Sequence, residues 1–191
     1  MKKQLKNVYL IIGRSGSGKD SIVDGVVNQG YSRIVSYTTR PRRLNEKNTH
    51  IFISDTEVDS YRDDMCAYTK IGEYEYFATY EQLMNNDFYI IDPAGLQNLI
   101  SKKENHQHKS LENINFVVIY VYVPQDLRVS RLVDIRKDKP EVMTKRLEDE
   151  EKQFAEFEEK RKYDYMITNI DLEKSITSVI DIVNRNNDLI S

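Results

Sequence analysis

Short apolar runs alternate with amphipathic stretches over most of the chain. The apolar runs at 8–12, 88–91 and 115–123 are nearly continuous, which is typical of strands buried on both faces of a parallel sheet. Residues 20–29 and 171–183 repeat apolar positions at helical spacing. This order of strands and helices predicts an α/β fold with a central parallel sheet.

The first half of the chain also contains shorter elements that do not fit this alternation. Residues 66–71 and 74–79 are β-like, and the pair Gly72-Glu73 between them is typical of a tight turn. We therefore expect a small antiparallel lobe inserted in the parallel core. Its further strands and helices are expected at 33–37, 50–54, 55–64 and 80–85.

The second half predicts two more helices before a last short strand at 165–168. The first begins after Pro124 and carries Arg128, Arg131 and Arg136. The second spans 141–162, and we expect its acidic run at 148–151 to be a solvated face without a catalytic role.

Length and charge narrow the classes of function. With 191 residues, the chain can form one α/β domain with a small insert, and a second independent domain is not expected. The formal net charge is -3 and the pI is about 5.7, so bulk charge gives no reason to expect a nucleic-acid or membrane partner. Cys66 is the single cysteine, and the N-terminus shows no apolar leader, so we expect a cytoplasmic protein.

The stretch GRSGSGKDS follows the first apolar run directly and has the form of a phosphate-binding loop. Glycines reach positive φ at low cost and let backbone N–H groups converge on a phosphate, while the next helix points its positive end inward. The alternative is a simple turn between a strand and a helix, but the spacing of the glycines and the lysine favours a nucleoside triphosphate site. The residues expected to bind the triphosphate are Gly13, Arg14, Ser15, Gly16, Ser17, Gly18, Lys19, Asp20 and Ser21.

Asp20 departs from the usual pattern of such loops. The residue after the lysine is normally Ser or Thr, whose hydroxyl binds Mg²⁺. A carboxylate is a good ligand for a hard cation, although it also repels the phosphates. We interpret Asp20 as a residue on the metal side of the site.

An arginine cluster follows the second predicted strand. Arg40, Arg42 and Arg43 lie within four residues and surround Pro41. Arginine presents paired donors that match phosphate oxygens, so such a cluster can hold a second phosphate group. A solvated basic loop is the alternative, but the position one strand after a phosphate loop favours the anion site.

Two further residues have both a functional and a capping interpretation. Asp92 ends the apolar run at 88–91, and ligands of open α/β sheets lie off the carboxyl ends of strands. It is also placed to cap a helix that starts at Pro93. Thr79 has the capping-box spacing with Gln82, so a cap alone would explain it.

Taken in order, these motifs resemble guanylate kinase from Val8 to Ile182, which is nearly the whole chain. The resemblance rests on the phosphate loop, the run Ser36-Tyr37-Thr38-Thr39-Arg40 with Arg43, the Asp92-x-x-Gly95 strand end, the arginine-bearing helices and Asn169. It implies a P-loop NTPase three-layer fold in one domain. The implied parts are a core (1–32, 88–125 and 163–191), a monophosphate-binding lobe (33–87) and a helical lid (126–162).

The resemblance also implies roles for individual residues. Arg40 and Arg43 match arginines on the phosphate of the monophosphate, and Lys19 and the lid arginines match groups around the transferred phosphoryl group. Asn169 matches a position near the adenine of ATP. The spacing before Arg136 is one residue longer than usual. The implied GMP-binding set is Ser36, Arg40, Arg43, His50, Phe77, Thr79 and Asp92, and the implied lid arginines are Arg131, Arg136 and Arg146.

The base-reading position departs from the family. Its usual Glu falls here at Tyr68, and Glu73 and Glu75 lie on the other strand of the predicted hairpin. The family implies ATP and Mg²⁺, with GMP as acceptor, and a monomer or homodimer. A related ribosyl bisphosphate phosphokinase, which needs no base pocket, is an alternative suggested by Gly18-Lys19-Asp20 and Asn48-x-His50. A non-catalytic interaction module of the same fold is a third, although such modules typically lose the phosphate loop.

Overall fold

The computed structural model describes residues 5–42, 49–134 and 140–189, and of residues 140–143, 145 and 146 it describes the backbone alone. Four strands form a sheet in the order β6-β1-β7-β8, and every adjacent pair is parallel. Their bounds are β1 (Lys6–Ile12), β6 (Phe88–Ile90), β7 (Ile114–Tyr122) and β8 (Tyr165–Thr168). The parallel central sheet predicted from the apolar runs is therefore confirmed.

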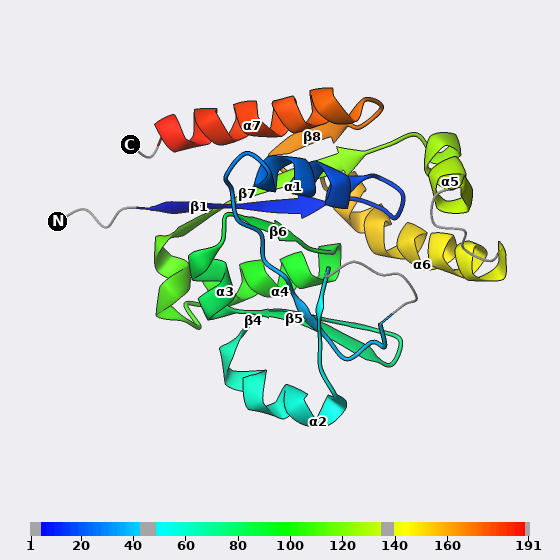
Figure 1. Ribbon diagram of the computed structural model, residues 1–191. Coiled ribbons are helices and arrows are strands. Elements are labelled where there is room, and N and C mark those ends of the chain that lie inside the picture. The colour runs from blue at the N-terminus through cyan, green and yellow to red at the C-terminus, as the bar shows by residue number, and fades with distance from the viewer. Residues whose placement is uncertain (1–4, 43–48, 135–139, 190–191) are drawn as a thin grey trace.

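Helices cover both faces of this sheet, as the layers in Figure 1 show. On one face Tyr9 and Ile11 of β1 pack with the apolar sides of α1 (Lys19–Val27) and α7 (Leu172–Asp188). On the other face Val8, Leu10 and Ile12 pack with α3, α4 and α6. Alternate residues of one strand thus enter two different cores, which makes three layers. The remaining helices are α3 (Tyr80–Asn85), α4 (Pro93–Glu104), α5 (Gln125–Asp134) and α6 (Pro140–Glu159).

A second sheet lies below the first in Figure 1 and has the order β3-β2-β5-β4. The predicted hairpin is confirmed, because β4 (Met65–Ile71) and β5 (Tyr74–Thr79) pair antiparallel. The lobe is mixed instead of purely antiparallel, since β2 (Tyr37–Thr38) pairs parallel with β3 (Ile51–Phe52).

Two short elements of the first half differ from the predicted ones. The predicted helix at 55–64 is one α-helical turn, α2 (Asp55–Val58), followed by a 3₁₀ segment, η1 (Asp59–Asp64). The predicted strand at 33–37 is reduced to a bridge between Arg33 and Phe88 and the start of β2. A second 3₁₀ segment, η2 (Lys109–Asn113), precedes β7.

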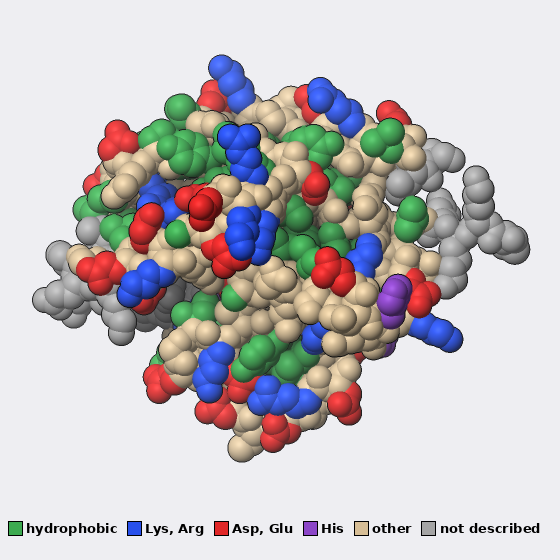
Figure 2. Space-filling view, turned by 180° about the vertical axis from the view of Figure 1, so that it is seen from behind, with side chains coloured by type: hydrophobic (Ala, Val, Ile, Leu, Met, Phe, Trp, Pro, Cys, Tyr) green, Lys and Arg blue, Asp and Glu red, His purple; other side chains and the backbone are tan. Residues whose placement is uncertain are grey.

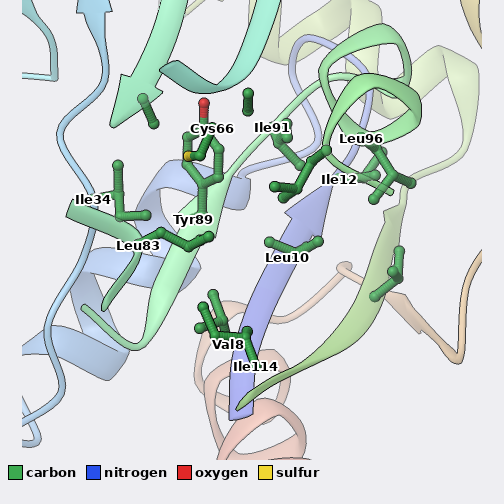
Figure 3. Close-up of a cluster of buried hydrophobic side chains, with 14 of the residues drawn as sticks. Val8, Leu10, Ile12, Ile34, Cys66, Leu83, Tyr89, Ile91, Leu96 and Ile114 are labelled. Carbon is green, nitrogen blue, oxygen red and sulfur yellow. The ribbon is translucent and has the colours of Figure 1, made fainter. Parts of the chain in front are cut away.

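The hairpin is fixed to the main sheet by shared apolar packing. Cys66, Ala67 and Ala78 are fully buried in the same cluster as Leu10 and Ile91 of the parallel sheet. Figure 3 shows Cys66 beside Tyr89 and Ile91 between the two sheets. Burial raises the pKa of the Cys66 thiol to about 12. The lobe therefore has a defined place relative to the phosphate loop.

The surface carries charges of both signs. Figure 2 shows basic and acidic side chains interspersed on the face seen from behind. Within the described part of the chain, no helix combines the length and apolar character that crossing a lipid bilayer requires.

Candidate active site

The predicted phosphate loop connects β1 to α1. Gly16 and Gly18 both have φ of 79°, a conformation that glycine adopts without strain. The loop is closed by a hydrogen bond of 3.1 Å from the Ser17 amide to the Arg14 carbonyl. Gly18 caps α1, so Lys19 and Asp20 occupy the first turn, where helical N–H groups have no partner inside the helix. This backbone is suited to an anion.

Close packing explains why glycine is needed at two of these positions. A Cβ on Gly13 would lie 2.7 Å from the Val121 carbonyl oxygen. A Cβ on Gly18 would overlap the side-chain amide of Asn169. Asn169 is 2% exposed, and its Nδ2 donates to the Ser17 carbonyl at 2.8 Å, while its Oδ1 accepts from Ser175. The structure thus places Asn169 against the loop itself.

Asp20 has an ion partner inside the protein. Its carboxylate lies 3.7 Å from the guanidinium of Arg33, which also pairs with Asp24 at 2.7 Å. The Asp20 side chain is 52% exposed, so it remains open to solvent beside the loop. A carboxylate in this place can bind a divalent cation. Such a cation would lie close to the positive charge of Arg33, which already pairs with Asp20. Ser21 lies beside it, exposed on the same helix.

The outer side of the loop is held by glutamates of α6. The Ser15 amide donates to Glu150 at 2.8 Å, and Arg14 makes a bidentate pair with Glu158 at 3.0 and 2.8 Å. Arg14 also pairs with Glu151 at 2.6 Å. Our expectation that the acidic run at 148–151 is a solvated face is therefore wrong for Glu150, whose side chain is 13% exposed, whereas Glu151 is exposed although it pairs with Arg14. An acidic run in a long helix gives no sequence signal of this contact.

Of the predicted lid arginines, one reaches the loop. Arg131 in α5 donates to the Asn169 carbonyl at 3.0 Å, and its other terminal nitrogen lies 3.5 Å from the Gly16 carbonyl. Arg136 lies outside the described residues. Arg146 lies in α6, and its side chain is not described.

The acceptor side of the site is built from side chains of the lobe. Ser36 Oγ and His50 Nδ1 are 3.0 Å apart, so a hydrogen bond joins the two residues. The guanidinium of Arg40 lies over the Phe52 ring, 5.5 Å from its centroid, and Arg40 is 8% exposed. Ser36, Arg40 and His50 therefore belong to one group of polar side chains, while Arg43 lies outside the described residues.

The structure does not bring Phe77 to this group. Phe77 is buried on the far face of the lobe sheet, stacked on Tyr37 at 5.1 Å between ring centroids. Its neighbour Tyr76 points to the opposite face, because side chains alternate along a strand. The Tyr76 ring lies 5.8 Å from that of His50. Sequence analysis missed Tyr76 by one residue, although the register of the hairpin would have shown it.

Asp92 connects the lobe to the phosphate loop. Its Oδ1 accepts from Gly95 N at 2.7 Å as the cap of α4 and from Thr69 Oγ1 of β4 at 3.0 Å. Burial raises the pKa of Asp92, opposed by these hydrogen bonds and by the positive charge of Lys19. Asp92 therefore caps α4 and also lies at the candidate site.

Thr79 is the buried cap of α3. Its hydroxyl accepts from the Gln82 amide at 3.2 Å, and the Gln82 side chain accepts from the Thr79 amide at 3.2 Å. The predicted capping box is confirmed. This hydroxyl is already engaged within its own chain segment.

Glu75 of the hairpin lies on the far face of the lobe sheet. Tyr68 pairs in register with Phe77 and shares its far face, where Glu75 is held by Arg62 at 2.7 and 3.2 Å. The hydrogen bond from Arg62 lowers the pKa of Glu75, which is thereby kept as a paired carboxylate. The opposite face of the hairpin carries Thr69 and Tyr76, and next to them Ala67 opposite Ala78, both buried in the core shared with the main sheet.

Comparisons with known proteins show the family of the chain. The family model described as guanylate kinase matches residues 5–186. The guanylate kinase of Mycoplasmoides gallisepticum is 27% identical over 92% of this chain and 91% of its own length, and that of Neisseria gonorrhoeae is 28% identical over 93% and 87%.

Solved structures agree on the fold. The crystal structure of guanylate kinase from Anaplasma phagocytophilum has a TM-score of 0.66 and 19% identity, and covers 97% of this chain and 88% of that one. Shikimate kinase from Acinetobacter baumannii has a TM-score of 0.50 and 14% identity, over 96% of each chain. The match of the family model over nearly the whole chain, together with these relatives, shows that the chain belongs to the guanylate kinase family.

Proposed function

We propose that this protein is an ATP-dependent nucleoside monophosphate kinase that converts GMP and ATP to GDP and ADP. One observation carries the proposal. Asp92 touches the acceptor lobe through Thr69, and its carboxyl is within electrostatic reach of Lys19 in the phosphate loop. The phosphate loop and the lobe proposed to hold a second phosphate are thus adjacent. This is the arrangement that direct phosphoryl transfer requires.

The proposed roles follow from the geometry of each group. The loop 13–21 binds the phosphates of ATP, and Lys19 and Arg131 neutralise the charge on the transferred group. Ser36, Arg40, His50 and Tyr76 hold the acceptor phosphate. From the family we add Arg43, Arg136 and Arg146 to the charged groups around the transfer.

The chemistry needs little from the protein beyond positioning. The bond from the terminal phosphorus of ATP to its bridging oxygen breaks, and a bond to an oxygen of the acceptor phosphate forms. That acceptor oxygen is already anionic, so no general base is required. Mg²⁺ that enters with ATP supplies further charge neutralisation, for which Asp20 is the proposed protein ligand. Closure of the lid over the cleft excludes water and limits hydrolysis of ATP.

The identity of the base is the finer part of the proposal. Guanine presents N–H donors that a buried carboxylate can accept, and Asp92 is a carboxylate beside the acceptor lobe. Glu75 is already paired with Arg62 on the far face. The loss of one buried acceptor reduces discrimination between bases by about 1–3 kcal/mol. We therefore propose GMP as substrate with weaker base selectivity than a hairpin carboxylate would give.

A sugar phosphate is the second candidate acceptor. The place of the family's base-reading Glu favours it, because that place holds Tyr68 here, which pairs with Phe77 on the far face of the lobe sheet. The same phosphate-binding residues would then hold a ribose bisphosphate.

Release of ADP, coupled to an optical readout, tests both proposals with one panel. The acceptors are GMP, dGMP, AMP, CMP, UMP and ribose 1,5-bisphosphate. Fastest turnover with GMP supports the main proposal, and turnover with the sugar bisphosphate alone supports the second. If no acceptor gives ADP above the rate of ATP hydrolysis, the kinase proposal is wrong. Calorimetry with ATP then shows whether the protein is a binding module instead.

A further inference from the structure

Two helices outside the phosphate loop hold its outer side. Glu150 of α6 accepts from the Ser15 amide through Oε1 and from Arg128 of α5 through Oε2, at 2.8 and 2.9 Å. Both oxygens of one carboxylate are therefore engaged, one by the loop backbone and one by a buried cation. Glu150 is 13% exposed and Arg128 6%, measured on their side chains, so this pair is screened from water.

The neighbouring charges form a second set of contacts between α6 and the loop. Arg14 lies between Glu158 and Glu151 and over the ring of Phe154, 5.2 Å from the ring centroid. The Tyr120 hydroxyl donates to Glu158. Burial works to raise the pKa of Glu158, but the bonds from Arg14 and Tyr120 leave that pKa lowered. The arginine is thus held on α6 by ion pairs whose partners are themselves hydrogen-bonded.

The helix α5 contributes directly to the loop. Its Arg128 lies 3.5 Å from the Ser15 carbonyl, and its Arg131 lies 3.5 Å from the Gly16 carbonyl. A Cβ on Gly16 would lie 2.7 Å from the Arg128 carbonyl, so the backbone of α5 is as close as the loop allows. The Ser15 amide and the Ser15 and Gly16 carbonyls are thus contacted by side chains of α5 and α6.

We propose that Glu150 is a positioning residue for the phosphate loop, which it holds in the shape that binds the triphosphate. This inference rests on the proposed function for its role in ATP binding, and on the geometry alone for its role in the loop. A carboxylate cannot itself stabilise phosphate charge, and here Arg128 offsets its repulsion. Because Glu150 bonds both the Ser15 amide and Arg128, it fixes the positions of the loop, α5 and α6 relative to one another.

Substitution of Glu150 tests this proposal, because it should change the KM for ATP and leave the KM for the acceptor unchanged. Glu150→Ala removes a charge-assisted hydrogen bond, so we expect the KM for ATP to rise about tenfold, with the KM for the acceptor unchanged. Glu150→Gln keeps an oxygen that accepts from the Ser15 amide, and we expect it to recover most of the ATP affinity. Glu148→Ala, at an exposed position in the same helix, is the matched control and should leave both constants unchanged.

Hydrogen exchange of the Ser15 amide, followed by NMR without nucleotide, gives a readout that does not depend on the kinase activity. We expect faster exchange in Glu150→Ala and unchanged exchange in Glu148→Ala. Unchanged exchange in Glu150→Ala overturns the inference, as does an unchanged KM for ATP. If the wild-type protein lacks kinase activity but Glu150→Ala still speeds exchange, the proposed function fails while the positioning of the loop stands.

Discussion

The two proposed anion sites of this protein are built in opposite ways. The donor side is a loop of backbone amides, and the side chains of Glu150, Arg128 and Asn169 hold that backbone in place. The acceptor side is a set of side chains on a small sheet, where Ser36, His50 and Tyr76 meet through their hydroxyl and ring atoms. A backbone site depends on glycines and on what packs behind them. A side-chain site depends on which residues of each strand face the cleft.

This difference predicts different responses to substitution. On the donor side the lysine carries a charge that no other loop residue replaces, so its loss should be severe. On the acceptor side several side chains are proposed to bind one phosphate, so the substitution of any one of them should reduce activity only in part.

Lys19→Ala should remove most of the activity. The loss of this ammonium from the transferred phosphoryl group should lower kcat about 100- to 1,000-fold, as for other charge-stabilising donors. Steady-state ADP release measures the effect, and circular dichroism checks the fold. Lys174→Ala is the matched control, since Lys174 lies exposed in α7 with 86% of its side chain open. Activity that survives in Lys19→Ala would remove the donor side from the proposal.

Tyr76→Phe should weaken the acceptor side alone. A hydroxyl that bonds a charged phosphate is worth about 1.5–3 kcal/mol, so the KM for the acceptor should rise tenfold or more. The KM for ATP should not change. The matched control is Phe77→Leu, which alters the neighbouring residue on the far face of the sheet.

Phe77→Leu should reduce stability by about 1 kcal/mol through lost aromatic packing and leave both KM values unchanged. The opposite pattern, in which Phe77→Leu raises the acceptor KM and Tyr76→Phe does not, would restore the original sequence prediction for Phe77. Thermal unfolding and steady-state kinetics on the two variants decide between the patterns.

Asn169→Ala tests whether the donor loop needs support from behind. The substitution leaves the Ser17 carbonyl without its partner at 2.8 Å, which should cost about 1–3 kcal/mol in unfolding free energy. ATP affinity should fall with it, because the loop carries the phosphate-binding amides. Urea unfolding and calorimetry with an ATP analogue measure the two effects. A loss of stability without a loss of ATP affinity would mean that the loop keeps its shape unaided.

Asp92→Asn should have the smallest effect, and it should depend on pH. Burial raises the pKa of Asp92 above its ordinary value of 3.8, so ionising this group costs stability in the folded state. The advantage of the Asn variant in unfolding free energy should therefore grow as pH rises from about 3.8 through the folded pKa, then level off. Asn also keeps the helix cap, so Asp92→Ala should be less stable than Asp92→Asn by about 1 kcal/mol at every pH. An advantage that shrinks with rising pH would contradict the raised pKa.

The sequence predicted the donor side well because its signal is local. The loop glycines and Lys19 are adjacent in the chain, and the strand before them and the helix after them have clear periodicity. The contacts of Glu150 could not be predicted from local sequence. An acidic residue on a solvated helix face and one that holds a loop have the same sequence pattern. Tertiary packing of α6 on the loop decides between them.

The acceptor side was predicted less completely. An error of one residue along a strand assigns a side chain that lies on the opposite face of the sheet. Tyr76 and Phe77 are neighbouring aromatics, and sequence spacing selected Phe77, whose side chain lies on the face of the lobe sheet away from His50. The pairing of Thr38 with Tyr76 settles which face each residue occupies. Asp92 was placed correctly, since a strand end followed by Pro is a local pattern too.

The burial of Cys66 makes this protein convenient for fluorescence work. Its thiol donates to the Thr79 carbonyl within the core, and a pKa of about 12 leaves almost no thiolate at neutral pH. A maleimide dye would therefore react with a cysteine introduced by Glu73→Cys at the exposed hairpin turn and leave the native one untouched. Such a label, on an otherwise unaltered chain, would report how the tip of the hairpin moves when each nucleotide is added.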